Sequence, residues 1–214
     1  MSTKHIVKTE AEWLELRKQY ITASEASVLV GADPYSSPAK LRNPEPFLGN
    51  AFTRVGQMLE PVVVNVTNDV LGTSFVLYET PEGYKEFYTR ELLGATPDAH
   101  EDRKMLLECK TTRPATYLKY SAVPPSKYLI QVIVQLYCTG LEEAFLSIMS
   151  TDLTQASPEL KWPVSIYKVW KCGTICDIIK TQAEKFTNNK TFRVDSKVKQ
   201  KVRLLLTLCY ERII

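Results

Sequence analysis

The sequence lacks the features that direct a protein into or across a membrane. Its first ten residues, MSTKHIVKTE, have no apolar core of the kind found in signal peptides. No apolar run approaches the roughly 20 residues that a membrane-spanning helix requires. No internal repeat or low-complexity tract is present either. We therefore expect a cytosolic or nuclear protein that is not secreted and does not bind a membrane.

Cysteine is sparse, and its arrangement argues against both disulfides and structural zinc. The five cysteines are an odd number scattered through mostly apolar sequence, at positions 109, 138, 172, 176 and 209. This pattern is typical of reduced, buried thiols. Cys172 and Cys176 are spaced by one helical turn, but no second pair has the spacing of a zinc site.

Net charge is also low, and its distribution says more than its total. The formal charge of +3 is too small to indicate a nucleic-acid-binding protein by itself. Residues 185–214 hold eight Lys and Arg against two acids, so this segment is +6 and the remainder is −3. Either the segment forms a phosphate-contacting surface or it is the solvated face of a terminal helix.

Length and composition predict one domain. A chain of 214 residues with 44% hydrophobic and 24% charged residues is an ordinary globular protein that buries roughly 70% of its unfolded surface. Two full domains would be cramped. We predict a single domain over residues 1–214, with a basic helical extension from about residue 173.

Local patterns predict an α+β fold in which a mixed sheet is flanked by helices. Two capping boxes, Thr9 with Glu12 and Thr22 with Glu25, mark the starts of helices. Other helices are expected at 53–70 (with a kink or break at Pro61), at 126–137, at 174–186 and from 196 onward. Strands are expected at 145–149 and 164–170, and at 75–78, 86–93 and 105–111 as an antiparallel meander. Proline-rich stretches at 33–49 and 114–125 are expected to be loops.

The stretch from Gly94 to Thr112, GATPDAHEDRKMLLECKTT, carries the main chemical signal. In a strand, side chains two residues apart share a face, so Glu108 and Lys110 project together. If residues 100–104 form a hairpin turn, Asp98 lies beside Glu108. The pattern predicts that two carboxylates and a lysine converge.

Such a trio suits hydrolysis of a phosphodiester. Two carboxylates can hold Mg²⁺ or Mn²⁺, which polarises the phosphate and lowers the pKa of a bound water. A protonated lysine cannot bind metal but can orient the water or offset developing charge. The alternative is an ordinary strand with one solvated face, and for the short E-C-K motif alone this alternative is the commoner case.

Several other polar residues lie where they could serve such a site. Glu60 stands beside the apolar stripe of the helix predicted at 53–70, either as a surface acid or as a third carboxylate. Gln131 and Gln135 are four apart and share one helix face. The Thr22 and Ser24 hydroxyls at a helix start form either a simple cap or an anion site.

Five separated segments, in order, resemble the lambda-exonuclease-type, YqaJ-like viral recombinase nucleases of the PD-(D/E)xK superfamily. The resemblance covers about residues 13–150 and implies a restriction-endonuclease-like core. The matching strings are RKQYITASE (17–25), GQMLEP (56–61), GATPDA (94–99), LLECK (106–110) and YLIQVIVQLYCTG (128–140).

The resemblance implies a role for each matching residue. Asp98, Glu108 and Glu60 would bind metal together with the backbone carbonyl of Cys109, and Lys110 would assist the water. The metal implied is Mg²⁺, for which Mn²⁺ can substitute. The remaining matches are Gln131 as the active-site helix glutamine, and Arg17, Ser24 and Thr96 as the group that holds the 5′-terminal phosphate.

Two positions depart from the family pattern. The usual Asp-Gly is Asp98-Ala99 here, and the second glutamine of a Gln-x-Gln helix pattern is Ile133. Neither change removes a metal ligand. The resemblance therefore does not fix the shape of the turn or the DNA contacts of that helix.

The resemblance implies a Mg²⁺-dependent 5′-to-3′ exodeoxyribonuclease that acts on double-stranded DNA ends during viral recombination or genome processing in a host cell. It also implies a single-strand annealing partner and a ring-shaped homotrimer. The alternatives are a structure-specific or sequence-specific endonuclease of the same superfamily, including one that cuts RNA, and a catalytically silent DNA-end-binding module. An iron–sulfur exonuclease of related fold is disfavoured because its four-cysteine set is missing.

Overall fold

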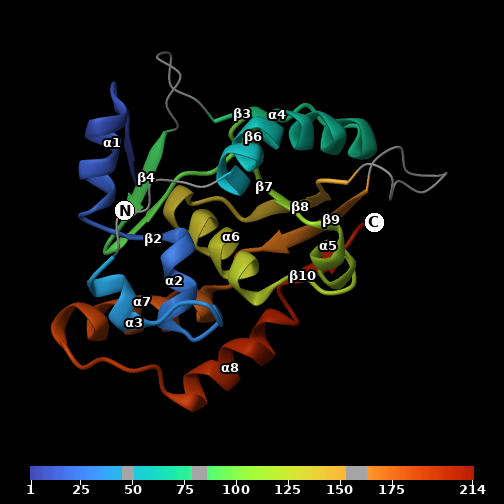
Figure 1. The fold of residues 1–214 in the computed structure, drawn as a ribbon. Coiled ribbons are helices and arrows are strands. Elements are labelled where there is room, and N and C mark those ends of the chain that lie inside the picture. Colours follow the sequence, from blue (N-terminus) through green and yellow to red (C-terminus); the bar gives the residue numbers. More distant parts are fainter. Residues whose placement is uncertain (45–50, 79–85, 153–162) are drawn as a thin grey trace.

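The computed structural model of the chain describes residues 1–44, 51–78, 86–152 and 163–214. Ten strands and eight helices are described (Figure 1). The helices are α1 (Glu10–Arg17), α2 (Ala23–Leu29), α3 (Pro38–Arg42), α4 (Ala51–Leu71), α5 (Pro114–Tyr120), α6 (Ser126–Thr139), α7 (Gly173–Asn188) and α8 (Ser196–Leu206). The strands are β1 (Thr3–His5), β2 (Ile21–Thr22), β3 (Val76–Leu77), β4 (Phe87–Arg90), β5 (Leu93–Ala95), β6 (Ala99–Glu101), β7 (Met105–Thr112), β8 (Glu143–Ser150), β9 (Val164–Trp170) and β10 (Tyr210–Arg212).

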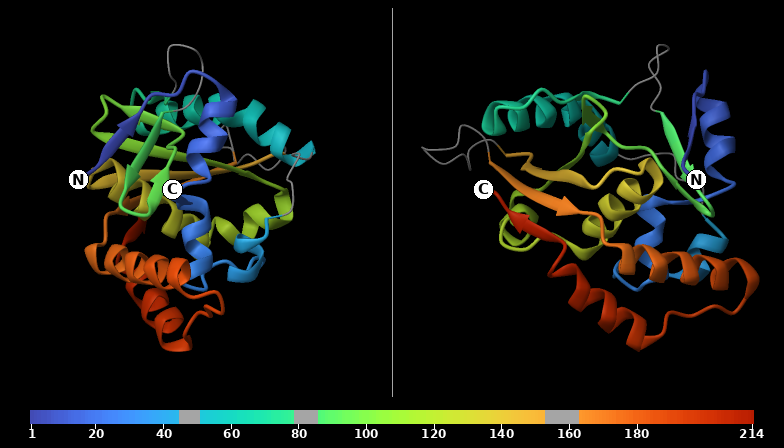
Figure 2. Two further views of the ribbon diagram at one scale, coloured as in Figure 1. Left: turned by 90° about the vertical axis from the view of Figure 1, so that its left-hand side faces the viewer. Right: turned by 180° about the vertical axis from the view of Figure 1, so that it is seen from behind.

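The larger sheet is mixed and lies between helical layers, as predicted. Its strand order is β10-β9-β8-β7-β6-β3, with β7 and β8 parallel and the other neighbours antiparallel. Helix α4 covers one side of it, while α6, α7 and α8 lie on the other (Figures 1 and 2). A parallel β7–β8 pair needs a crossover connection, which α5 and α6 supply.

Two apolar clusters fill the two faces of this sheet. Leu106 of β7 belongs to the cluster that contains the buried residues of α6, whereas Leu107 and Cys109 belong to the cluster formed with Val63 of α4. The alternation along β7 therefore assigns Glu108 to the α6 side. Helices α7 and α8 add buried residues to the α6 cluster, so the basic C-terminal segment shares this core.

The predicted three-strand meander is wrong. Residues 86–93 do not join the strands at 75–78 and 105–111 but lie in a second sheet with order β1-β4-β5-β2. A turn with Glu91 at φ 56° separates β4 from β5. The short outer strands β1 and β2 come from distant parts of the chain, so no local pattern indicated this sheet.

The two predicted proline-rich loops each contain a helix. Pro38 and Pro114 occupy the first turn of α3 and α5, where the missing N–H has no intrahelical partner to lose. Proline therefore starts these helices. By contrast Pro61, predicted as a kink or break, lies within the single helix α4. Residues 45–49 of the first predicted loop lie outside the described residues.

Thr9 and Thr22 both start helices as predicted, and the full capping box forms at Thr22, whereas Glu12 accepts a hydrogen bond from the N–H of Lys8 instead of from Thr9. Thr9 is the N-cap of α1 and accepts a hydrogen bond from the N–H of Glu12 at 3.2 Å. Gly140 follows α6 in the left-handed conformation, φ 81°, which terminates the helix. All five cysteines are free thiols. None of the described helices is both long enough and apolar enough to cross a membrane.

Candidate active site

A tight hairpin between β6 and β7 brings two carboxylates together. Asp102 and Arg103 form its turn with φ of 50° and 55°. Ala99 pairs with Leu107, so the preceding residue, Asp98, lies across from Glu108. The Asp98 Oδ2 accepts a hydrogen bond from the N–H of Cys109 at 2.8 Å. The predicted turn and the predicted proximity of Asp98 to Glu108 are both present.

Glu108 is buried, with only 1% of the residue exposed. Its Oε1 accepts hydrogen bonds from Lys110 Nζ and from Gln131 Nε2. Its Oε2 accepts one from Gln135 Nε2 at 2.5 Å. Both carboxylate oxygens are therefore held by α6 and by the neighbouring lysine, which leaves this side chain little rotational freedom.

The pKa values of Glu108 and Lys110 depend on burial and on the charge of Asp98. Burial raises the pKa of Glu108, the negative charge of Asp98 raises it further, and Lys110 and Gln135 oppose the rise without cancelling it. Burial alone lowers the pKa of Lys110, but Glu108 and Asp98 outweigh burial and raise it above the ordinary lysine value. Lys110 is consequently a cation, beside a carboxylate that is costly to ionise without a further positive charge.

Gln135 is the residue whose role the sequence reasoning missed. Its Nε2 contacts the Thr96 carbonyl at 3.4 Å as well as Glu108. Its Oε1 is buried, and no group in the described part of the chain donates a hydrogen bond to it. The signal was present, since Gln131 and Gln135 share a face, yet only the packing of α6 on β7 shows that both amides reach one carboxylate.

A small cavity of about 200 Å³ adjoins this cluster. Asp98 and Gln131 are among its lining residues. The other lining residues come from the N-terminal helices and the strands beside them, namely Trp13, Arg17, Thr22, Ala23, Ser24, Phe87 and Thr96. The structure thus brings the predicted Arg17, Ser24 and Thr96 to one cavity, although they are far apart in the chain.

Arg17 is held at this cavity by an aromatic ring. Its guanidinium carbon lies 4.3 Å from the centre of the Trp13 ring, whose Nε1 donates to Thr96 Oγ1 at 3.4 Å. Burial lowers the pKa of Arg17, and the more distant Glu25 only partly offsets this effect. Across the described ranges, no carboxylate lies within 4.0 Å of the guanidinium. A desolvated cation in this position favours an anionic ligand.

The two hydroxyls at the start of α2 have different surroundings. Glu25 Oε2 accepts hydrogen bonds from the backbone N–H of Thr22 at 2.9 Å and from its hydroxyl at 2.7 Å. This is the capping interpretation, and it holds for Thr22. The hydroxyl of Ser24 lies 3.1 Å from that of Thr22 and lines the cavity with Arg17, where it can also face a ligand.

Glu60 comes from a different element than the other predicted metal ligands. It belongs to α4, which packs on the β7 face that carries Leu107 and Cys109, and it is half-buried. No group of three or more His, Cys, Asp or Glu side chains in the described ranges is placed to hold a metal ion. Its role as a ligand stays a prediction.

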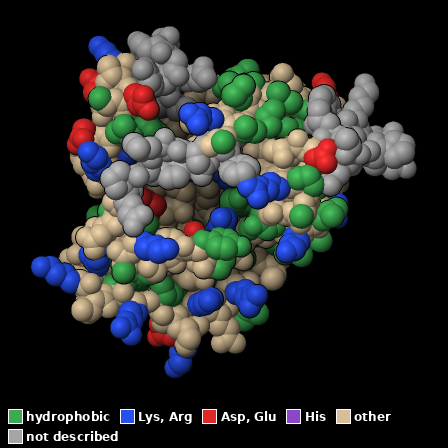
Figure 3. Space-filling model, viewed as in Figure 1, with side chains coloured by type: hydrophobic (Ala, Val, Ile, Leu, Met, Phe, Trp, Pro, Cys, Tyr) green, Lys and Arg blue, Asp and Glu red, His purple; other side chains and the backbone are tan. Residues whose placement is uncertain are grey.

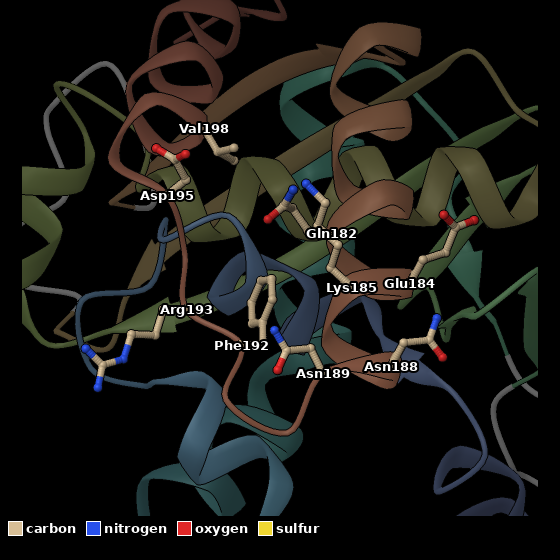
Figure 4. A pocket seen from close by; sticks show the side chains of 9 residues that line it. All are labelled: Gln182, Glu184, Lys185, Asn188, Asn189, Phe192, Arg193, Asp195 and Val198. Carbon is tan, nitrogen blue, oxygen red and sulfur yellow. The ribbon is translucent and has the colours of Figure 1, made fainter.

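The remaining donors fit a hard divalent cation. The carboxylates of Asp98 and Glu108 face each other across the hairpin, and the negative charge of Asp98 raises the pKa of Glu108. A bound divalent cation would neutralise this repulsion. The backbone carbonyl of Cys109 lies between Glu108 and Lys110. A larger cavity of about 610 Å³, between α7 and the start of α8, is lined by other residues and contains no facing pair of carboxylates (Figure 4).

Comparison with known proteins shows what this chain is similar to. The model of the family described as YqaJ-like viral recombinase domain matches residues 12–142. No curated protein matches the sequence. An alkaline exonuclease from Laribacter hongkongensis has a similar fold, with a TM-score of 0.63, 18% identity, and 92% of this chain and 97% of that one covered. The same enzyme in complex with dAMP gives a TM-score of 0.61 with the same identity and coverage. A phage-related exonuclease from Haemophilus somnus 129PT gives a TM-score of 0.60 at 14% identity, with 87% of this chain and 96% of that one covered.

Proposed function

We propose that this chain, which belongs to the YqaJ-like viral recombinase family, is a Mg²⁺-dependent exodeoxyribonuclease that degrades double-stranded DNA from the 5′ end. Nuclease activity follows from the family. The metal, the duplex substrate and the 5′-to-3′ direction are our proposal. The observation that carries it is one cavity lined by Arg17 together with Asp98 and Gln131.

The catalytic part of the proposal rests on the Asp98 and Glu108 pair. Asp98, Glu108 and the Cys109 carbonyl would hold Mg²⁺, with Glu60 as a further carboxylate; Mn²⁺ can substitute. When bound, the ion polarises the phosphate and lowers the pKa of its water. Lys110, a cation in contact with Glu108, is suited to orient that water or to offset charge on the phosphate.

The end-specific part rests on the cavity beside Asp98. A terminal phosphate is an anion that can accept hydrogen bonds from Arg17, Ser24 and Thr96. An internal phosphodiester carries less charge and continues in both directions, so a cavity of this small size disfavours it. Because Asp98 lines the same cavity, an end held there lies next to the metal-binding carboxylates. We therefore assign Arg17, Ser24 and Thr96 to the 5′-phosphate.

The biological setting and the assembly are further proposals. The family description supports a role in viral recombination or genome processing inside a host cell. The same resemblance supports a ring-shaped homotrimer and a single-strand annealing protein as partner. Measuring the mass of the protein in solution tests the trimer directly.

The deciding experiment uses one linear duplex with a blunt 5′-phosphate at one end and a 5′-hydroxyl at the other, together with a covalently closed circle. We expect Mg²⁺-dependent loss of the linear DNA from its phosphorylated end, an intact circle, and no cleavage by Asp98→Asn. The matched control is Asp102→Asn, in the turn of the same hairpin, which should cleave normally because asparagine also tolerates positive φ.

Each other outcome rejects a specific part. Cutting of the circle rejects the exonuclease in favour of an endonuclease. Degradation from the 3′ end rejects the phosphate pocket. Absence of metal-dependent cleavage of either DNA, with retained binding to ends, leaves a catalytically silent end-binding module.

A further inference from the structure

A line of alternating cations and aromatic rings leads away from Glu108. Lys110 Nζ lies 5.3 Å from the centre of the Tyr128 ring. Lys127 Nζ lies 5.1 Å from the centre of the same ring and 5.3 Å from that of the Tyr35 ring. Tyr35 is 73% exposed. The catalytic cluster is thus connected to the surface through two tyrosines and two lysines.

Helix α8 extends this line. Ser126, next to Lys127, lines a cavity of about 250 Å³ together with Pro34, Lys199 and Arg203. A Cβ placed on Gly31 would lie 3.2 Å from Lys199 Cδ. The aliphatic stem of Lys199 therefore lies against the backbone that leads to Pro34 and Tyr35, and α8 adjoins the segment that carries the exposed ring.

Apart from Lys110, which pairs with Glu108, the cations along this line lack local acidic partners. No carboxylate in the described portion lies within 4.0 Å of Lys127, Lys199 or Arg203, whereas Lys168 of β9 pairs with Glu143 at 3.0 Å. Asp33 is nearby, but its Oδ1 accepts the N–H of Tyr35. Basic side chains gather on this face of the molecule, around α8 (Figure 3). Unpaired cations in a row are suited to contact successive phosphates.

We propose that Tyr35, Lys127, Tyr128, Lys199 and Arg203 form a track for an unpaired DNA strand that runs between the catalytic cluster and α8. The proposal rests on the proposed function and names a further binding site for its substrate. The exposed ring of Tyr35 selects single-stranded DNA, because unpaired bases can stack on it. In a duplex the bases are stacked on one another, so a duplex could use the cations but not the ring.

The test measures binding of labelled oligo(dT) to the full chain by fluorescence anisotropy at several salt concentrations. It is done in EDTA and with unphosphorylated ends, so that neither cleavage nor the Arg17 cavity contributes. For the pair Lys199→Gln and Arg203→Gln we expect weaker binding and a log–log salt slope shallower by about 1.4, since each single-strand phosphate contact contributes about 0.7.

The matched control is the pair Lys197→Gln and Lys201→Gln, which removes the same charge from the opposite flank of α8. Its slope should stay that of the unaltered chain. Tyr35→Ala should weaken oligo(dT) binding by about tenfold, whereas Tyr35→Phe keeps the ring and the affinity. Equal effects of the two charge pairs, or no effect of Tyr35→Ala, would overturn the track.

The same assays separate the two proposals. A chain that binds oligo(dT) through Lys199 and Arg203 but never cleaves DNA keeps the track and loses the nuclease assignment. A chain that cleaves from the 5′ end, with oligo(dT) binding unchanged by both pairs of substitutions, keeps the nuclease and loses the track.

Discussion

The side-chain amide of Gln135 donates a hydrogen bond to Oε2 of Glu108 at 2.5 Å, inside a site where Glu108 is 1% exposed. Lys110 and Gln131 donate hydrogen bonds to the other carboxylate oxygen, Oε1. We expect Gln135, itself buried, to act as a positioning residue that helps to fix the orientation of the Glu108 carboxylate.

Gln135→Met should slow cleavage about 10- to 100-fold, as expected when the support of a metal ligand is removed. The unfolding free energy should also fall by about 1–3 kcal/mol, because a buried acceptor loses its donor. Affinity for a DNA end, measured without metal, should stay unchanged. The control is Gln182→Met, a buried glutamine of α7 that should affect stability alone. Equal cleavage rates in the two variants would refute the positioning role.

Mg²⁺ should raise the melting temperature of the DNA-free protein, because a ligand that binds only the folded state stabilises it. Asp98→Asn and Glu108→Gln should abolish this rise. Glu60→Gln should reduce the apparent Mg²⁺ affinity if its carboxylate completes the site, and a titration followed by thermal unfolding measures this directly. An unchanged titration for Glu60→Gln would remove Glu60 from the ligand set, and EDTA should eliminate cleavage in every active variant.

Arg17→Ala should abolish the preference for 5′-phosphorylated over 5′-hydroxyl ends. The reason is that the guanidinium beside Trp13 is desolvated and lines the cavity next to Asp98. The measurement is the ratio of initial cleavage rates on the two substrates. Lys18→Ala provides the control, since this neighbouring cation is exposed and pairs with Glu15. A ratio that survives in Arg17→Ala is incompatible with the pocket.

Glu86→Gln should lower the free energy of unfolding at neutral pH. It should also make the loss of stability between neutral and acidic pH smaller than in the unaltered chain. Burial would raise the pKa of Glu86, but hydrogen bonds from Arg103, Lys4 and Tyr88 outweigh burial and lower the pKa to about 2. A pKa lowered from 4.5 means that the stabilisation is present above about 4.5 and is lost as pH falls toward 2.

The full pKa difference corresponds to roughly 3 kcal/mol, but Lys4 and Arg103 are 37% and 47% exposed, so we expect about 1–2 kcal/mol. Urea unfolding at several pH values measures it. Glu142→Gln, which removes a surface ion pair with Lys171, should change stability by less than about 1 kcal/mol. Parallel pH profiles for Glu86→Gln and the unaltered chain would contradict the assignment.

Gly94→Ala should destabilise the fold by about 1–3 kcal/mol through overpacking. A Cβ at this position would lie 2.3 Å from Phe87 Cζ and 3.1 Å from Tyr20 Cβ, and because Phe87 is 1% exposed, displacing its ring disturbs buried packing. Thermal unfolding measures the loss. Gly173→Ala, where a new Cβ would meet nothing within 4 Å, should be nearly neutral, and a similar loss in both variants would mean that packing is not the cause.

The sequence by itself was sufficient wherever the determining interactions are local. The β6–β7 hairpin follows from a short turn and from side-chain alternation, so the proximity of Asp98 and Glu108 and the shared face of Lys110 could be predicted. The helix starts at Thr9 and Thr22 and the end at Gly140 are likewise set within a few residues. Proline was the exception, because Pro38 and Pro114 start helices as readily as they break them.

Only the tertiary structure decided what depends on pairing across long stretches of chain. Strand β1 pairs with β4 more than 80 residues later, and neither strand carries a local signal for its partner, so the second sheet was missed. The same holds for Gln135 on Glu108, for Arg17 beside Thr96, and for Lys199 against Gly31. Short-range patterns determine which faces are apolar, whereas the docking of those faces determines which polar side chains meet.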